Sequence, residues 1–165
     1  MTKRLILMRH AKSGWDDPTL SDIDRPLNAR GRADATALGG WLKDSAYLPD
    51  AVLCSAATRT RETLALLNIQ ATVTFMEGLY LAPPAHMMEA LKDCSADTIL
   101  LIGHNPGIGD LAQDIVTNAP DHKQFYDYPT GATLVCDLPI TNWANAVSRS
   151  AQMVDFIVPR DLEAG

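Results

Sequence analysis

The sequence predicts a three-layer α/β fold, with a mostly parallel central sheet and helices on both of its faces. Short apolar runs are typical of buried strands, segments with helical spacing separate them, and the two kinds alternate along the 165 residues. Because parallel strands need a long crossover, usually a helix, this alternation favours a parallel sheet. A chain of this length buries about 70% of its unfolded surface, so residues 1–165 are expected to form one domain.

The first half of the chain predicts three strands and two helices. Residues 5–8 form an apolar run that charged residues follow at once, as in a strand buried on both faces. From about residue 28, apolar positions recur at helical spacing, although Gly39 and Gly40 weaken this helix. The sequence then indicates a strand at 51–54, a helix with a polar start at 59–67 and a β-branched strand at 71–75.

The second half continues the alternation. It predicts a helix at 84–91, the most apolar strand of the chain at 98–102, a helix from 107 to about 117, and strands at 132–136 and 153–157. A turn-rich stretch around Trp143 joins the last two strands. These two strands are candidates for an antiparallel pair.

Composition excludes several classes of function. The formal net charge of −6 argues against broad nucleic-acid binding, which needs clustered Lys and Arg. The sequence has no apolar run long enough to span a bilayer and no signal-peptide pattern, so a soluble cytoplasmic protein is expected. Three cysteines without CxxC spacing indicate buried free thiols. The four histidines show no HExxH or i,i+4 pairing, so neither a metal nor another cofactor is expected.

Charged and imidazole side chains follow the predicted strands at the points where they end. Arg9 and His10 follow the first strand, the second leads to Arg59, the third runs into Glu77, and His104 follows the fourth. Ligands of open α/β sheets bind at the carboxyl ends of the strands, so these residues are expected at one edge. Arginine matches phosphate oxygens and a neutral imidazole can attack phosphorus. The sequence therefore predicts a phosphoryl site.

Each of these residues also has a purely structural alternative. A single histidine after a strand is more often a hydrogen-bonded surface group than a catalyst, and His86 and His122 are expected to be solvated. Arg9 alone fits a rim charge, and Arg59 fits an ion pair with Glu62 or Asp24. The convergence of several such residues on strand ends favours the functional interpretation.

At these residues the chain resembles the histidine phosphatase superfamily, in the branch that contains phosphoglycerate mutases, and especially its small SixA-like phosphohistidine phosphatases. Residues 5–11 resemble the family's first strand, which is followed by Arg-His-Gly. Residues 55–63 are similar to its second-arginine motif, and residues 102–106 are similar to its second-histidine motif. Further matches lie at residues 24–28 with Gly31, 129–132 and 159–162. Ala11 replaces the usual Gly, and the Asn that mutase-like members carry after the nucleophile is missing, which points away from mutase activity.

This resemblance implies a phosphoglycerate mutase-like fold and a metal-independent phosphatase. By the resemblance, His10 attacks phosphorus in line and becomes a phosphohistidine. Arg9, Arg59 and His104 then hold the transferring oxygens until water releases phosphate. The implied substrate is a phosphohistidine in a protein or a small phosphorylated metabolite. A monomer or weak dimer that binds neither nucleic acid nor membrane is expected.

Two further residues belong to the candidate site. Glu77 stands where the family's proton donor would follow the third strand, with a solvated loop charge as the alternative. A phosphohistidine substrate needs such a donor less, because an imidazole leaves more readily than an alkoxide. Arg25 is a candidate substrate contact, and a structural ion pair with Asp22 or Asp24 is the equal alternative.

Two functions of other classes compete with this interpretation. Residues 107–112 match the dinucleotide fingerprint GxGxxA, but residues 104–106 separate the strand from the glycines, and no acidic residue ends a strand about 20 residues later. We therefore treat the match as accidental. The second is a catalytically inactive module of the same fold that binds phosphate or docks on phosphoproteins. The presence of a nucleophile, His10, together with the phosphate-binding residues Arg9, Arg59 and His104 disfavours this module, because a binding module does not need a nucleophile.

Overall fold

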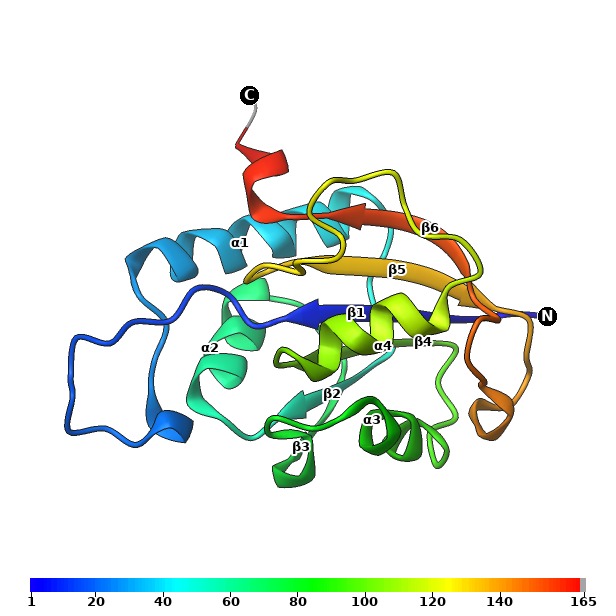
Figure 1. Ribbon diagram of the computed structural model, residues 1–165, viewed down its shortest axis with the longest axis horizontal. Coiled ribbons are helices and arrows are strands. Elements are labelled where there is room, and N and C mark those ends of the chain that lie inside the picture. Colours follow the sequence, from blue (N-terminus) through cyan, green and yellow to red (C-terminus); the bar gives the residue numbers. More distant parts are fainter. Residues whose placement is uncertain (164–165) are drawn as a thin grey trace.

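The central sheet has six strands in the order β3-β2-β4-β1-β5-β6 (Figure 1). A computed structural model describes residues 1–163. The strands β1 to β4 pair in parallel, and β5 and β6 pair antiparallel with each other, as the sequence predicted. The structure adds that β5 pairs antiparallel with β1. In chain order the strands are β1 (Lys3–Arg9), β2 (Ala51–Ser55), β3 (Thr72–Met76), β4 (Thr98–Gly103), β5 (Thr133–Leu138) and β6 (Gln152–Ile157).

Helices cover both faces of this sheet, as the sequence also predicted. Helices α1 (Ala29–Asp44) and α2 (Thr58–Leu67) pack on one face, and α3 (Pro84–Leu91) and α4 (Gly107–Ile115) pack on the other (Figure 1). Within residues 1–163 no helix combines the length and the apolar character needed to cross a bilayer. The short 3-10 turns are η1 (Asp22–Asp24), η2 (Glu77–Leu79), η3 (Trp143–Asn145) and η4 (Pro159–Leu162).

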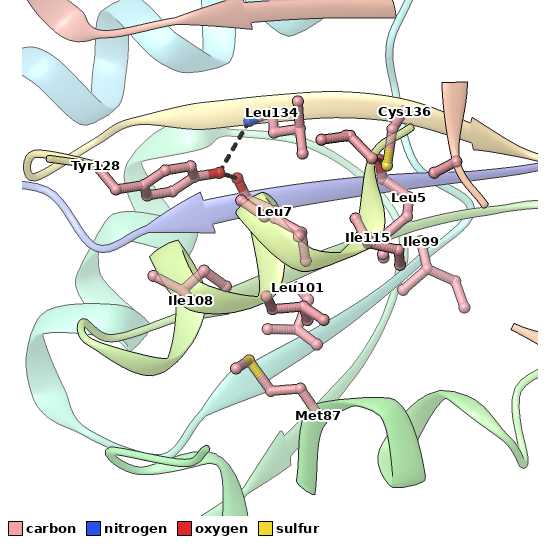
Figure 2. Close-up of a cluster of buried hydrophobic side chains, with 14 of the residues drawn as sticks. Leu5, Leu7, Met87, Ile99, Leu101, Ile108, Ile115, Tyr128, Leu134 and Cys136 are labelled. Atoms are coloured by element: carbon pink, nitrogen blue, oxygen red, sulfur yellow. Dashed lines mark hydrogen bonds between the residues drawn. The ribbon is translucent and has the colours of Figure 1, made fainter. Parts of the chain in front are cut away.

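Alternate residues of β1 divide between two hydrophobic clusters. Leu5 and Leu7 belong to the cluster under α3 and α4, which Figure 2 shows, whereas Ile6 and Met8 belong to the cluster under α1 and α2. All four are fully buried, as expected of a strand covered on both faces. The buried hydroxyl of Tyr128 donates to the Leu7 carbonyl oxygen at 2.5 Å, which ties the loop before β5 to β1. The strand that leads into the candidate site is therefore rigidly held.

The third strand differs from the other parallel strands. It lies at the edge of the sheet, and residues 72–75 are exposed. The β-branched sequence identified the strand to within one residue at each end, but only its edge position explains why it is not buried.

The carboxyl ends of the four parallel strands share one edge of the sheet. Arg9 at the end of β1 is level with Gly103 at the end of β4, and Ser55 is level with Met76 across β2 and β3. The segments that follow these strands, among them α2 and η2, therefore all start from this edge.

Gly39 and Gly40 lie in the middle of α1 but have opposite surroundings. A Cβ atom on Gly39 would lie 2.1 Å from the Leu67 carbonyl oxygen at the end of α2, whereas a Cβ on Gly40 would have no atom within 4 Å. Gly39 thus allows α1 to approach α2 closely. Gly40 makes no such contact and weakens the helix by roughly 0.5–1 kcal/mol relative to alanine.

We expect the two alanine substitutions to change stability in opposite directions. Gly39→Ala should lower the free energy of unfolding by about 1–3 kcal/mol, because the helices must move apart. Gly40→Ala should raise it by up to about 1 kcal/mol. Urea unfolding of both variants measures the difference, and a destabilisation of similar size in both would show that the close approach at Gly39 does not matter.

Candidate active site

Arg9, His10, Arg59 and His104 line one cleft of about 260 Å³ at the carboxyl edge of the sheet. His10 directly follows β1, Arg59 lies in the first turn of α2, and His104 directly follows β4. The ring centroids of His10 and His104 are 5.3 Å apart. Side chains from three separate segments are thus brought to one place.

The backbone of the next residue orients the ring of His10. Its Nδ1 lies 2.7 Å from the Ala11 carbonyl oxygen, which can only accept, so Nδ1 carries the ring proton. The Ala11 N–H donates to Thr63 Oγ1 at 3.0 Å, and the His10 N–H donates to the Gly103 carbonyl oxygen at 3.1 Å. Burial, reinforced by the charge of Arg9, lowers the pKa of His10 from its ordinary value to about 3. The ring is therefore neutral, and its Nε2 has a lone pair available for attack.

Three buried nitrogens of this cleft have no hydrogen-bond partner. They are Nε of Arg9, Nε of Arg59 and Nδ1 of His104, and no other buried side-chain nitrogen or oxygen in residues 1–163 lacks a partner. Buried polar groups in proteins are nearly always paired. Three unpaired nitrogens on residues that line the same cleft therefore indicate a site for a ligand rich in oxygen acceptors.

Asp22 in η1 anchors Arg59, the first of the two arginines in α2. Arg59 donates from Nη1 to the Asp22 carbonyl oxygen at 2.6 Å and from Nη2 to the Asp22 carboxylate at 3.0 Å. The hydroxyl of Tyr80 donates to the same carboxylate. This hydrogen bond is the main cause that lowers the pKa of Asp22 to about 2, and the contact with Arg59 adds to it. Asp22 is therefore ionised at neutral pH and orients Arg59. The alternative partners considered for Arg59, Glu62 and Asp24, were wrong, because Glu62 instead accepts from the Leu27 N–H at 2.8 Å.

Arg25 forms one of the ion pairs considered for it, and its role as a substrate contact stays a prediction. It is 8% exposed, forms the expected ion pair with Asp22 at 3.1 Å, and lines the cleft. Its Nη1 donates to Ser13 Oγ at 2.9 Å, and its guanidinium lies 3.4 Å from the ring centroid of Trp15. Arg25 therefore holds Trp15 at the rim of the cleft.

Glu77 does not line the cleft. It begins η2, is exposed, and its side chain forms no hydrogen bond or ion pair with another residue of the described chain. Its assignment as proton donor stays a prediction. From the end of η2 it is Tyr80 that reaches the site, with its ring packed edge-on against His104 at 5.4 Å.

Sequence reasoning missed two polar residues that organise this edge. Ser55, at the end of β2, is fully buried with its Oγ 2.8 Å from His104 Nε2. Asn105 donates from Nδ2 to the Tyr128 carbonyl oxygen at 3.0 Å and accepts from the Gly109 N–H. A hydroxyl in the last position of an otherwise apolar strand is the signal by which Ser55 could have been found.

The glycines of residues 107–112 have a packing role. A Cβ atom on Gly107 would lie 1.8 Å from the Ala82 carbonyl oxygen, and one on Gly109 would lie 3.0 Å from Asn105 Oδ1. The GxGxxA pattern is thus explained by the close approach of α4 to its neighbours. The two remaining histidines lie elsewhere: His86 is exposed on α3, and His122 pairs with Asp161 at 2.9 Å.

The two neutral histidines predict acid sensitivity. Burial is the main cause that lowers the pKa of His10 to about 3 and the pKa of His104 to about 4, from an ordinary value of about 6.5. Above about pH 6.5 both rings are neutral in the folded and unfolded states. Below it the unfolded chain binds protons that the folded protein does not, so the free energy of unfolding should fall from about pH 6.5 to about pH 4.

Urea unfolding at a series of pH values measures this dependence. The double variant His10→Asn, His104→Gln should show a shallower decline over the same range, because it lacks both rings. A decline as steep as that of the unsubstituted protein would assign the acid sensitivity to other groups.

Known proteins are similar to this chain in sequence and in fold. Residues 5–80 match the histidine phosphatase superfamily (branch 1). An uncharacterized protein of Mycobacterium tuberculosis is 38% identical over 160 residues, which cover 93% of this chain and 100% of that protein. A structure from Nakamurella multipartitia, provisionally described as the phosphohistidine phosphatase SixA, has a TM-score of 0.86 at 29% identity and covers 96% of this chain and 97% of its own.

The fold alone is shared with a more distant structure, that of the protein histidine phosphatase SixA complexed with tungstate. Its TM-score is 0.79 at 20% identity, and the match covers 96% of this chain and 99% of that one. Fold and cleft together define a SixA-like phosphatase with the phosphoglycerate mutase-like α/β architecture. The chain belongs to the histidine phosphatase superfamily, in its branch 1.

Proposed function

We propose that this protein is a metal-independent phosphatase that carries the phosphoryl group on His10 during each turnover. One observation carries the proposal: the three unpaired buried nitrogens belong to Arg9, Arg59 and His104, which line the same cleft as His10. A transferring phosphoryl group has three non-bridging oxygens, so three such donors match its needs in number and in charge.

The reaction proceeds in two displacements. Nε2 of His10 attacks phosphorus, and the N–P bond forms while the bond from phosphorus to the leaving group breaks. Arg9, Arg59 and His104 stabilise the charge on the three oxygens. A water molecule then attacks phosphorus, and the N–P bond breaks with its electron pair returning to Nε2. Phosphate leaves with the water's oxygen and protons, and releases the excess proton to solvent. The two guanidiniums supply the positive charge that a metal ion supplies in other phosphatases.

The composition of the cleft favours a substrate that needs no proton from the enzyme. Among the described residues, those that line the cleft include no carboxylic acid, and the neighbouring Asp22 is held ionised. An alkoxide leaving group requires a proton donor in the site, whereas the imidazole of a phosphohistidine leaves as a neutral ring after its second nitrogen takes a proton from solvent. We therefore place phosphohistidine and other phosphoramidates ahead of alkyl phosphate esters as substrates.

The rim of the cleft supports a substrate larger than a phosphate ion. Trp15 and Leu81 line the cleft and are 73% and 50% exposed. Apolar surface beside a polar centre offers contacts for the part of the substrate beyond the phosphoryl group. A phosphohistidine on a protein surface fits this arrangement, and a small phosphorylated metabolite is the competing substrate.

A comparison of leaving groups tests the substrate class. We expect kcat/KM for a phosphohistidine peptide and for phosphoramidate to exceed that for glycerol phosphate by about 100-fold or more, the usual contribution of a general acid. Treatment with EDTA should leave the activity unchanged. Loss of activity on chelation that zinc restores would contradict the metal-independent reaction, and tight phosphate binding without turnover of any of these compounds would indicate an inactive module.

Glu77 provides the matched control for this comparison. If glycerol phosphate is hydrolysed as fast as phosphoramidate, the protein has a proton donor, and Glu77→Gln should then slow the glycerol phosphate reaction alone. If the phosphoramidate preference holds, Glu77→Gln should leave both reactions unchanged, and the predicted donor role of Glu77 fails.

A further inference from the structure

Ser55 makes an unusual contact at the end of β2. Its side chain is fully buried, and its Oγ lies 2.8 Å from Nε2 of His104. The same Oγ accepts a hydrogen bond from the Ala57 N–H at 3.3 Å. Among the described residues Oγ has no further polar partner, so the Nε2 atom of His104 is the one acceptor for the hydroxyl proton.

We propose that Ser55 is a positioning residue that fixes His104 as the tautomer with its proton on Nδ1. Because Nε2 accepts from Ser55, a neutral His104 ring must carry its proton on the other nitrogen. That nitrogen is the buried, unpaired Nδ1. The inference rests on the proposed function, since it makes Nδ1–H one of the three donors to the transferring phosphoryl group.

The tautomer matters because the ring is neutral. Burial, followed by the charge of Arg59, lowers the pKa of His104 to about 4. The other groups that face the ring are His10, Tyr80, Arg9 and, through Arg59, Asp22. A neutral ring has a single N–H. With the proton on Nε2, His104 would direct a lone pair rather than a donor at a phosphoryl oxygen, and the two would repel.

The tautomer can be measured in the resting protein without any substrate. Two-bond ¹H–¹⁵N correlation spectra of ¹⁵N-labelled protein at about pH 7 distinguish the two nitrogens of a neutral ring. The chain has four histidines, and the His104 signals are those that vanish in His104→Gln. We expect a protonated Nδ1 and an unprotonated Nε2 in the unsubstituted protein. The opposite assignment would overturn the proposal by itself.

Variants of Ser55 then test the cause. In Ser55→Ala, His104 should shift to the Nε2–H form that free histidine prefers. The value of kcat should then fall by roughly tenfold to 100-fold, since about 100-fold is the loss typical of a removed donor, and KM should change less. Ser55→Thr restores a hydroxyl and should restore both the tautomer and most of kcat. Retention of Nδ1–H and of kcat within about twofold in Ser55→Ala would overturn the role of Ser55.

Thr60→Val is the matched control for local packing. Thr60 is fully buried, and its Oγ1 donates to the carbonyl oxygens of Ser55 and Ala57 at 2.8 Å, but it does not touch His104. The Thr60→Val variant should have a lower free energy of unfolding, while its His104 keeps the proton on Nδ1. A tautomer shift in Thr60→Val as large as in Ser55→Ala would attribute the effect to general loosening and contradict the specific contact.

The tautomer of His104 and the covalent phosphohistidine on His10 are measured independently, so each can be absent without the other. A protein that forms a covalent phosphohistidine while His104 carries its proton on Nε2 would retain the proposed function and lose the role of Ser55. A protein with the Nδ1–H tautomer but no covalent intermediate would lose the proposed function instead.

Discussion

Replacement of His10 by alanine is expected to abolish covalent phosphorylation of the protein and to lower kcat by about 10⁴-fold or more. The reason is geometric. The Ala11 carbonyl oxygen binds Nδ1 and leaves the Nε2 lone pair of His10 free, whereas His104 has its Nε2 bound to Ser55 and, in the proposed tautomer, a proton on Nδ1. Of the two rings in the cleft, only His10 therefore presents an open nitrogen to phosphorus.

Rapid quenching of the reaction with a ³²P-labelled substrate measures this effect. The label on the unsubstituted protein should be labile in acid and stable in base, as a phosphohistidine is, and His10→Ala should carry none. His86→Ala, which removes an exposed ring of α3, should label and turn over normally. Label that persists in His10→Ala but disappears in His104→Ala would exchange the roles of the two histidines.

Arg59 and Arg61 should differ sharply, although they lie two residues apart in the same motif. Arg59 is 3% exposed and lines the cleft, whereas Arg61 is exposed and stacks over Phe75 with its guanidinium 4.0 Å from the ring centroid. Arg59→Ala should lower kcat/KM by about 10³-fold, because a charged donor aimed at the transferring oxygens is lost. Arg61→Ala should stay within about twofold of the unsubstituted protein.

Arg59→Lys refines this prediction. Lysine keeps the positive charge but lacks the planar guanidinium. In Arg59 that group binds Asp22 through Nη1 and Nη2 and leaves Nε for the substrate. We expect it to recover only a small part of the lost kcat/KM. Inhibition by inorganic phosphate provides a second measurement, since it should weaken in Arg59→Ala and not in Arg61→Ala. Equal losses of kcat/KM in Arg59→Ala and Arg61→Ala would show that Arg59 does not bind the transferring phosphoryl group.

Much of the architecture was predictable because its signals are local. The helix expected at residues 84–91 is α3 (Pro84–Leu91), and the strands expected at 98–102 and 153–157 lie within one residue of β4 and β6. The helix expected to reach about residue 117 ends earlier, at Ile115, since Val116 is already extended. Periodicity identifies such elements well and their ends less well, because helix ends depend on the contacts of the next segment.

The sequence by itself determined the order of strands and helices, and it placed Arg9, His10, Arg59 and His104 at the edge where they meet. Both follow from short-range patterns, since strand ends aim the next residues at the ligand edge of an α/β sheet. Only the tertiary structure decided that Asp22 rather than Asp24 anchors Arg59, that Arg61 stacks on Phe75, and that Ser55 touches His104. Those choices depend on through-space contacts between segments far apart in the chain, and no local pattern records them.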